Sequence, residues 1–318
     1  MPGPHLAQLF NAAQIDITRS VTFTKDSRNL LGEGSFGQVY LGRCTLSNNQ
    51  QIRVAVKLLK FTPQDRRKIE ERLKREVVTW KSVSQLDNVA DFMGIYRTPN
   101  EPPYLVLPYY RHNNLLKYTS ACHPDTRLAL AKQICRGLHN LHLNNVVHGD
   151  LKPVSQSLPS ESILLHLLTL SMNQENIMIS DSGDAQIADF GVSIIPSLSG
   201  FTTVINWNAR YSAPELLPIT DSVPIKPTKE TDIFSLGILL MQLFDGQPDC
   251  LPYNHFRVDQ HRDPHEINLI RAIHQGDRPK FARYNFQYQE NRWALIERCW
   301  AADPRSRLDI GRVRAKLA

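Results

Sequence analysis

The chain has 318 residues, of which 42% are hydrophobic and 21% are charged, as in an ordinary globular protein. Its length suits one large domain or two packed lobes. Thirty-seven basic and 31 acidic residues give a net charge of +6. Because this excess is spread along the chain, it predicts a solvated surface and no nucleic-acid partner.

The cysteines are few and scattered, and no two of them form a C-x-x-C pair; they are Cys44, Cys122, Cys135, Cys250 and Cys299. This pattern argues against a disulfide framework or a zinc site and favours a reducing compartment. Residues 1–10 lack the basic-then-apolar run of a signal peptide. The longest apolar segment, residues 233–244, is too short to span a bilayer. We therefore expect a cytoplasmic protein without a membrane partner.

Residues 1–27 show no strong pattern and are predicted to be a short leader. Residues 31–39 then read L-G-E-G-S-F-G-Q-V, which is the pattern G-x-G-x-x-G-x-V. Glycines let a backbone bend and approach phosphate oxygens, which main-chain N–H groups can bind. The same glycines occur in dinucleotide-binding folds, where the third glycine opens a helix. Here apolar residues alternate after residue 38, which favours a hairpin over a nucleotide; a purely structural turn is the alternative.

Residues 54–57 read V-A-V-K, an apolar strand that ends in a lysine. Such a lysine ordinarily extends its ammonium group to solvent. Residues 63–82 predict a helix with one apolar stripe, formed by Ile69, Leu73, Val77 and Trp80. Glu76 lies on that stripe, where an unpaired carboxylate would be costly. Lys57 is therefore its predicted partner.

Two strands are predicted at residues 91–97 and 104–107, and a helix at residues 126–144. The helix leads into V-V-H-G-D-L-K-P, residues 146–153, and the motifs E-N-I-M-I-S and D-F-G follow at residues 175–180 and 189–191. Taken one at a time, the polar residues of these motifs have an ordinary interpretation as loop residues. Taken with Lys57 and Glu76, they resemble the catalytic and metal-binding loops of eukaryotic protein kinases.

This resemblance covers about residues 28–318 and implies an α+β fold of two lobes. The N-lobe, about residues 28–108, would be small and β-rich with one key helix. The C-lobe, about residues 111–318, would be larger and mainly helical. We expect the domain to end with the last helix of the chain.

The resemblance also implies a role for each polar residue. Asp150 would be the catalytic base that accepts the proton of the substrate hydroxyl. Lys152 would steady the transferring phosphoryl group, and Lys57, held by Glu76, would bind the α and β phosphates of ATP. The Mg²⁺ ions would be held by Asn176 and Asp189.

The resemblance further implies an ATP pocket formed by Leu31, Gly32, Gly34, Gly37, Val39, Ala55, Lys57, Tyr110 and Met178. Residues 104–110, Y-L-V-L-P-Y-Y, resemble the strand and hinge that hold adenine, with Leu107 at the back pocket. Pro108 has no N–H, so Tyr110 is the predicted main-chain donor to adenine. An ordinary strand end is the alternative.

An inserted segment interrupts the catalytic loop. The family pattern places the metal-binding asparagine five residues after the catalytic aspartate, but here Ser155 holds that position. Removing the 21 residues 154–174 brings Asn176 from 26 to five residues after Asp150. It also shortens the separation of Asp150 and Asp189 from 39 to 18, as the resemblance implies. One excision restores both spacings.

We hypothesise that residues 154–174 are a retained intron of the gene model. Val154-Ser155 can be encoded by a splice-donor sequence and Gln174 by the final C-A-G of an acceptor. The alternative is a surface insertion, whose closure would cost only about 2 to 3 kcal/mol of chain entropy. Its apolar run, residues 163–170, would however need to be buried.

Two positions depart from the family. Gly149 replaces an arginine that usually binds a phosphorylated activation loop, which predicts activity without that phosphorylation. Asn208 replaces a threonine that usually contacts the catalytic aspartate, and its amide could make the same hydrogen bond. Lys152 nevertheless favours serine or threonine over tyrosine as the phosphate acceptor.

The carboxy-terminal third carries further matches. Residues 210–215, R-Y-S-A-P-E, resemble the end of the activation segment, and Glu215 should pair with Arg307. Asp232 should bond the catalytic-loop backbone; a simple N-cap is its alternative role. Residues 299–307 resemble the tyrosine-kinase-like and tyrosine-kinase groups, although Leu308 replaces their usual proline. With H-G-D, this resembles the tyrosine-kinase-like kinases abundant in fungi.

The expected function is an ATP- and magnesium-dependent protein kinase that acts on serine or threonine of protein substrates. The alternative is a catalytically impaired kinase fold, a pseudokinase, that serves as a nucleotide-binding or protein-interaction module. The phosphoryl-transfer residues favour the enzyme, whereas the insertion and Gly149 favour the pseudokinase.

Overall fold

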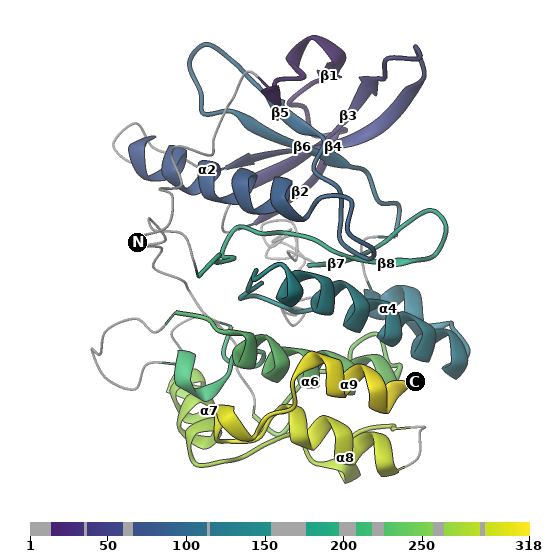
Figure 1. Cartoon of the computed structure of the whole chain (residues 1–318), viewed down its shortest axis with the longest axis vertical. Coiled ribbons are helices and arrows are strands. Elements are labelled where there is room, and N and C mark those ends of the chain that lie inside the picture. Colours follow the sequence, from purple (N-terminus) through teal and green to yellow (C-terminus); the bar gives the residue numbers. More distant parts are fainter. Residues whose placement is uncertain are drawn as a thin grey trace.

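The computed structural model describes residues 14–34, 37–59, 66–112, 115–153, 176–196, 208–217, 226–256, 264–286 and 290–318. Two lobes are stacked along the long axis, a sheet with one helix above and a mainly helical lobe below (Figure 1). The predicted insertion, residues 154–174, lies outside the described residues.

The upper lobe is built on a six-stranded sheet of order β1-β3-β4-β6-β5, with β2 paired to β3. All of the pairings between these strands are antiparallel. The strands are β1 (Val21–Phe23), β2 (Leu30–Gly34), β3 (Gly37–Thr45), β4 (Gln51–Leu59), β5 (Gly94–Tyr96) and β6 (Tyr104–Pro108). The short helix η2 (Thr18–Ser20) precedes β1, and α2 (Arg66–Val83) follows β4.

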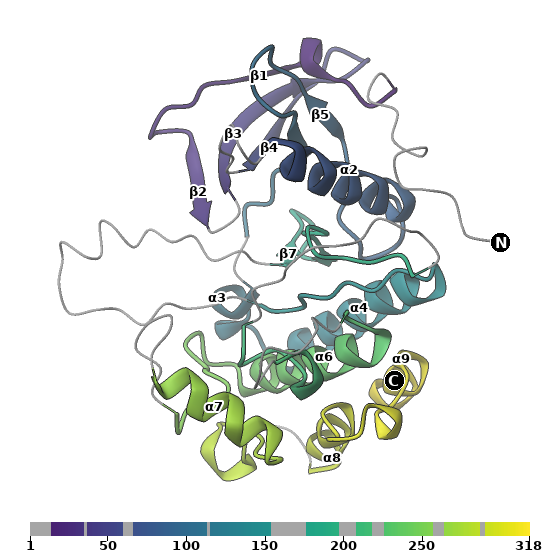
Figure 2. The same ribbon diagram turned by 90° about the vertical axis from the view of Figure 1, so that its left-hand side faces the viewer.

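Period-two alternation gives this sheet two different faces. Val54 and Val56 of β4 point into one buried cluster, together with Val106 of β6. The intervening residues Ala55 and Lys57 point to the opposite face, which α2 covers from below in both views (Figures 1 and 2). The alternation therefore presents the Lys57 ammonium to α2.

The lower lobe consists of helices and one small hairpin. The helices are α3 (Leu115–Ser120), α4 (Pro124–Leu143), α6 (Lys229–Asp245), α7 (Pro264–His274), α8 (Glu290–Cys299) and α9 (Ile310–Leu317), with single turns η4 (Pro214–Leu216), η5 (Phe281–Arg283) and η6 (Pro304–Ser306). The hairpin pairs β7 (Ile177–Ile179) with β8 (Ala185–Ile187). The predicted two-lobed α+β architecture is confirmed.

Helix α6 runs through the centre of the lower lobe. Every residue from Thr231 to Asp245 is buried, as expected for a helix that is apolar on all sides. Thr228 and Thr231 form a capping box at its start, and Gly246 ends it in the left-handed conformation with φ of 74°. The apolar segment of residues 233–244 forms most of this buried helix. In the part of the chain that the structure describes, no helix is long and apolar enough to cross a membrane.

The loop after α2 fastens the two lobes together. Asn88, in the left-handed region with φ of 61°, donates from its side chain to the Ala185 carbonyl at 2.9 Å. Its own carbonyl accepts from Ile187 N at 2.9 Å, and the Ala90 N–H donates to the Ile187 carbonyl at 2.8 Å. These bonds connect the end of α2 to β8, immediately before the D-F-G motif.

Candidate active site

Lys57 lies between two carboxylates. Its Nζ is 2.8 Å from Oε1 of Glu76 and 2.8 Å from Oδ1 of Asp189. Lys57 is only 6% exposed and Glu76 is fully buried. Burial alone would lower the pKa of Lys57, but the charges of Asp189 and Glu76 outweigh it and raise that pKa. The predicted Lys57–Glu76 ion pair is present, and the lysine carries its charge at neutral pH.

Asp189 reaches Lys57 because the backbone of the D-F-G motif is held in an unusual conformation. The φ of Asp189 is 63°, a value that costs a non-glycine residue free energy and that clusters at functional sites. The next side chain, Phe190, is buried between Trp80 of α2 and His148, with ring centroids 5.1 and 5.4 Å away. This aromatic contact joins α2 to the catalytic loop and directs Asp189 toward Lys57.

Asp150, Lys152 and Asn176 form a second cluster. Lys152 Nζ is 2.7 Å from Oδ2 of Asp150, and Asn176 Nδ2 donates to the same oxygen at 3.1 Å. Asn176 Nδ2 also donates to the main-chain carbonyl of Asp150. The two residues are 26 positions apart in the sequence, yet they are hydrogen-bonded neighbours. This is the arrangement that the shortened spacing predicts.

The residues present fit a magnesium ion. Asn176 Nδ2 is used by Asp150, whereas its Oδ1 is buried and has no hydrogen-bond partner among the described residues. The Asn176 carbonyl accepts from the Ala188 N–H at 2.8 Å, which brings Asn176 beside Asp189. An amide oxygen and a carboxylate are ligands that Mg²⁺ accepts. No group of three His, Cys, Asp or Glu that could hold a metal ion occurs in the described ranges.

Asp232, at the start of α6, supports the catalytic loop from below. Its Oδ2 accepts from His148 N at 2.9 Å, and its Oδ1 accepts from Gly149 N at 2.8 Å. His142 Nε2 lies 2.9 Å from Oδ2 as well. The predicted bond from Asp232 to the loop backbone is confirmed, while the participation of His142 was not foreseen.

His148 is held in one tautomer by its neighbours. Its Nδ1 accepts from the Asp150 N–H at 3.2 Å, so the ring proton is on Nε2, which donates to the Ala188 carbonyl at 3.0 Å. The His148 carbonyl accepts from the buried hydroxyl of Ser193 at 2.7 Å. The ring thus ties the residue before Asp189 to the loop that carries Asp150.

The end of the activation segment is anchored by the predicted ion pair. Nη1 and Nη2 of Arg307 bind the two carboxylate oxygens of Glu215 at 2.6 and 2.9 Å, a bidentate geometry. Asn208 behaves differently from the expectation. Its Oδ1 accepts from Arg210 N at 3.2 Å, and the described residues include no hydrogen bond from Asn208 to Asp150. Asn208 therefore shapes the local turn, and the preference for serine or threonine rests on Lys152.

Two residues of the predicted ATP pocket are neighbours of Lys57 in the sheet. Val39 is the cross-strand neighbour of Lys57, and Ala55 pairs with Leu107 on the same face of the sheet. The side chains that would contact adenosine are all half-buried; they are Leu31, Val39, Ala55, Tyr110 and Met178. They leave apolar surface next to the charged cluster.

The glycine motif forms the predicted hairpin. Gly34 pairs with Gly37 across β2 and β3, and Gly32 is paired with Val39. A Cβ at Gly37 would lie 1.8 Å from the Leu58 carbonyl oxygen. This glycine is therefore required by the close approach of β4, in addition to any phosphate.

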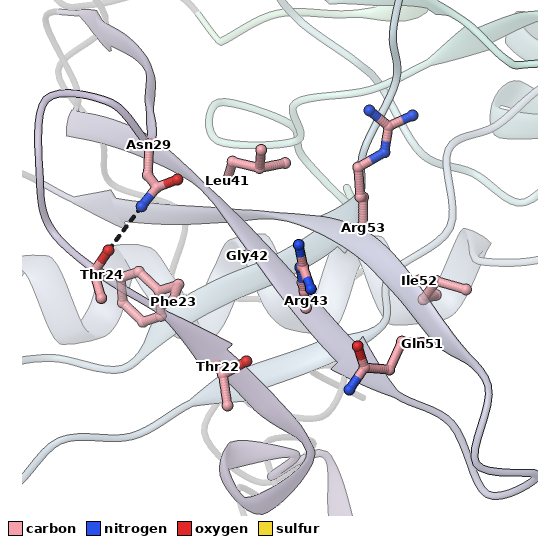
Figure 3. Close-up of a pocket in the computed structure, with 10 residues that line it drawn as sticks. All are labelled: Thr22, Phe23, Thr24, Asn29, Leu41, Gly42, Arg43, Gln51, Ile52 and Arg53. Carbon is pink, nitrogen blue, oxygen red and sulfur yellow. Dashed lines mark hydrogen bonds between the residues drawn. The ribbon is translucent and has the colours of Figure 1, made fainter.

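A separate cavity of about 510 Å³ lies on the sheet toward the β3–β4 turn (Figure 3). Arg43 and Arg53, which are cross-strand partners, are among the residues that line it, and the Arg53 guanidinium group lies over the Tyr109 ring at 4.6 Å. Its polar rim is partly used within the protein, because the Asn29 amide donates to the Thr24 hydroxyl, which donates to Asp26. The residues that line this cavity do not include Lys57, Asp150, Asn176 or Asp189. The cavity is therefore separate from the candidate active site formed by those four residues.

Activity is expected not to depend on phosphorylation of the activation loop, because Gly149 offers no guanidinium group to a phosphate. Replacing Ser197, Ser199, Thr202 and Thr203 together by alanine should leave kcat/KM within about twofold of the wild type. A more than tenfold loss in a peptide phosphorylation assay would contradict this prediction. Ser193 is excluded from the set, because its buried hydroxyl supports His148. Ser193→Ala should instead lower stability by about 1 kcal/mol.

Two family models match the chain. Residues 26–154 match the family described as protein tyrosine and serine/threonine kinase, and residues 171–316 match the protein kinase domain. The two matches leave out residues 155–170, all of which belong to the predicted insertion.

Curated relatives agree with these matches. Serine/threonine-protein kinase PrkC of Bacillus subtilis is 25% identical over 86% of this chain and 37% of its own length. Serine/threonine-protein kinase STY46 of Arabidopsis thaliana is 26% identical over 90% of this chain and 42% of its own length. Serine/threonine protein kinase OSK3 of Oryza sativa is 26% identical over 89% of this chain and 48% of its own length. The chain thus spans less than half the length of these relatives. Together with the two family matches, they show that the chain carries a eukaryotic-type protein kinase domain.

Proposed function

We propose that this protein transfers the γ-phosphoryl group of ATP to serine or threonine hydroxyls of protein substrates. The observation that carries the proposal is the joint placement of two clusters, Lys57 with Glu76 and Asp189, and Asp150 with Lys152 and Asn176. One cluster positions charge on a nucleotide, and the other presents a carboxylate to a hydroxyl. Phosphoryl transfer requires both.

Each side chain has a distinct task in the reaction. Asp150 Oδ2 is occupied by Lys152 and Asn176, while no described side chain donates to its Oδ1. Oδ1 can therefore accept the proton of the substrate hydroxyl as the new O–P bond forms and the bond to ADP breaks. Lys152, whose Nζ is 2.7 Å from Oδ2 of the same carboxylate, is placed to stabilise charge on the transferring group. A bound Mg²⁺ would neutralise phosphate charge next to Asn176 and Asp189.

The proposal also covers substrate class, group and compartment. Lys152 beside Asp150 favours a serine or threonine acceptor, in keeping with the names of the curated relatives. The H-G-D motif and residues 299–307 favour the tyrosine-kinase-like group of fungal type. All five cysteines are free thiols, which supports the cytoplasm as the location. Nucleic acid and membranes are not among the proposed partners.

We propose further that residues 154–174 are an insertion separable from the catalytic machinery. In support, hydrogen bonds join Asp150, which precedes this segment, to Asn176, which follows it. If the segment is a retained intron, sequencing of the transcript will find a mature message that lacks its codons. A mature message that retains them would refute the intron hypothesis.

One assay tests the proposed activity. The full chain, the chain without residues 154–174 and each with Asp150→Asn are incubated with ATP, magnesium and peptides that contain serine, threonine or tyrosine. We expect Asp150-dependent phosphate transfer to the serine and threonine peptides by at least the shortened chain. No such transfer from either chain would refute the enzyme, and a nucleotide-dependent rise in Tm without turnover would then indicate a nucleotide-binding module.

A further inference from the structure

A short segment ahead of the family match is part of the upper lobe. Asp16 forms a parallel β-bridge with Ile95, in which the Ile95 N–H donates to the Ile15 carbonyl at 2.8 Å. The Ile17 N–H returns a bond to the Ile95 carbonyl at 3.0 Å. The segment therefore extends the sheet at β5, its edge strand. Residues 14–23 lie before residue 26, where the family match begins.

Ile15 is buried between the sheet and α2. It is 8% exposed and belongs to a buried cluster shared by both elements, whose other members are Leu59, Leu73, Val77, Ile95 and Leu105. Leu73 and Val77 are four residues apart on one face of α2, and Glu76 lies between them in the sequence. Leu105 is the cross-strand neighbour of Lys57. The cluster that contains Ile15 thus packs behind both partners of the Lys57–Glu76 ion pair.

Specific contacts of Asp16, Thr18 and the Ile15 backbone hold the segment against the sheet. Asp16 Oδ1 accepts from the N–H and the hydroxyl of Thr18 at 3.0 and 2.6 Å, which forms a local turn. Thr18 Oγ1 in turn accepts from the Arg97 N–H at 2.8 Å. On the other side, a Cβ at Gly94 would lie 2.6 Å from the Ile15 carbonyl oxygen. The glycine at this position allows the segment to approach β5.

The ion pair alone holds α2 weakly, because Lys57 has a second carboxylate. If α2 moved outward, Lys57 would keep Asp189 at 2.8 Å, and Glu76 would regain water. The charge on Lys57 would remain compensated, so little electrostatic free energy would oppose the movement. The apolar cluster around Ile15 must therefore contribute to the free energy that keeps Glu76 against Lys57.

We propose that Ile15 is a positioning residue for the Lys57–Glu76 pair and that residues 14–18 act as a built-in clamp on α2. Loss of the Ile15 side chain would shift the population of α2 toward an outward position, in which Lys57 is no longer oriented by Glu76. The effect on turnover rests on the proposed kinase function, whereas the effect on α2 does not.

The test compares Ile15→Ala with a matched control, Val21→Ala. Val21 belongs to the same segment and is 4% exposed, but it packs in the cluster on the opposite face of the sheet. Hydrogen exchange of the α2 amides is measured for both variants, together with kcat/KM and Tm. We expect Ile15→Ala to exchange about tenfold faster throughout α2 and to lose about tenfold in kcat/KM. Ile15→Val, which keeps most of the side chain, should restore both.

Val21→Ala should lower Tm about as much as Ile15→Ala does, while the hydrogen exchange of its α2 amides stays at the wild-type rate. An unchanged rate of α2 exchange in Ile15→Ala would overturn the proposal. Equal acceleration of α2 exchange in both variants would also overturn it, because the segment would then stabilise the lobe without positioning α2. The exchange measurement needs no activity. If the wild type fails to transfer phosphate, the proposed function fails and α2 exchange still decides whether Ile15 positions the helix.

Discussion

Replacing Asp150 by asparagine is expected to reduce kcat for peptide phosphorylation by about 10²- to 10⁴-fold. The amide is nearly the same size as the carboxylate and can still contact Lys152 and Asn176. It cannot, however, take the proton of the substrate hydroxyl, because an amide is not a base at neutral pH. Steady-state kinetics with a serine peptide measure the loss.

Nucleotide binding provides the control for this variant. Lys57, Asn176 and Asp189 are unchanged in Asp150→Asn, so ATP with magnesium should raise its Tm as it raises that of the wild type. A variant that keeps more than a tenth of the wild-type kcat would contradict the assignment of Asp150 as the base. A variant that loses the Tm shift would show that Asp150 also shapes the nucleotide site.

Removal of Lys57 is expected to destabilise the fold more than removal of the charge on Glu76. Lys57→Met removes the cation that Glu76 and Asp189 share, and breaking a buried ion pair in this way costs about 3 to 5 kcal/mol. Glu76→Gln leaves Lys57 with Asp189 and should cost only about 1 to 3 kcal/mol. Urea denaturation measures both free energies of unfolding. Equal losses would contradict the shared-lysine arrangement.

A double variant, Lys57→Met with Glu76→Gln, tests the coupling directly. Because it removes the charge of Glu76 together with that of Lys57, it should be less destabilised than the sum of the two single changes. Both single variants should also lose kinase activity, since Lys57→Met lacks the ammonium group for the phosphates and Glu76→Gln lacks the charge that orients it.

The stabilisation by Lys57 is expected to be constant across neutral pH. The pKa of Lys57 is raised in the folded state, with burial opposing and the two carboxylates producing the shift. A raised pKa gives stability that is fully present below the ordinary lysine pKa of about 10.4 and is lost as pH rises through the folded value. The difference in unfolding free energy between wild type and Lys57→Met should therefore not fall between about pH 6 and 9, and titration of the two carboxylates in the variant would only increase it. A loss of this difference within that window would show that Lys57 is not held charged.

Several features of the site could be read from local sequence pattern. Glu76 lies on the apolar stripe of α2, and a buried carboxylate needs a partner, which led to Lys57 before any contact was seen. The resemblance to protein kinases, with residues 154–174 set aside, implied Asn176, and it is hydrogen-bonded to Asp150. The resemblance to protein kinases supplied Asp232 and the Glu215–Arg307 pair, both of which are present.

Other features were decided only by tertiary structure. The amide of Asn208 could have bonded Asp150, but its Oδ1 accepts from Arg210 N instead, because a short polar side chain can satisfy itself within its own turn. The hydroxyl of Ser193 and the imidazole of His142 meet the catalytic loop through contacts between residues far apart in the chain.

Ile15 is the clearest case. Periodicity over a few residues cannot show which edge strand a segment will join, since that depends on the exposed N–H and C=O groups of β5 and on the space left by Gly94. The sequence by itself determined which residues carry the charge and where the helices and strands of the two lobes lie. The tertiary structure decided what holds α2 against Lys57, because that stabilisation comes from apolar burial among five separate segments of the chain.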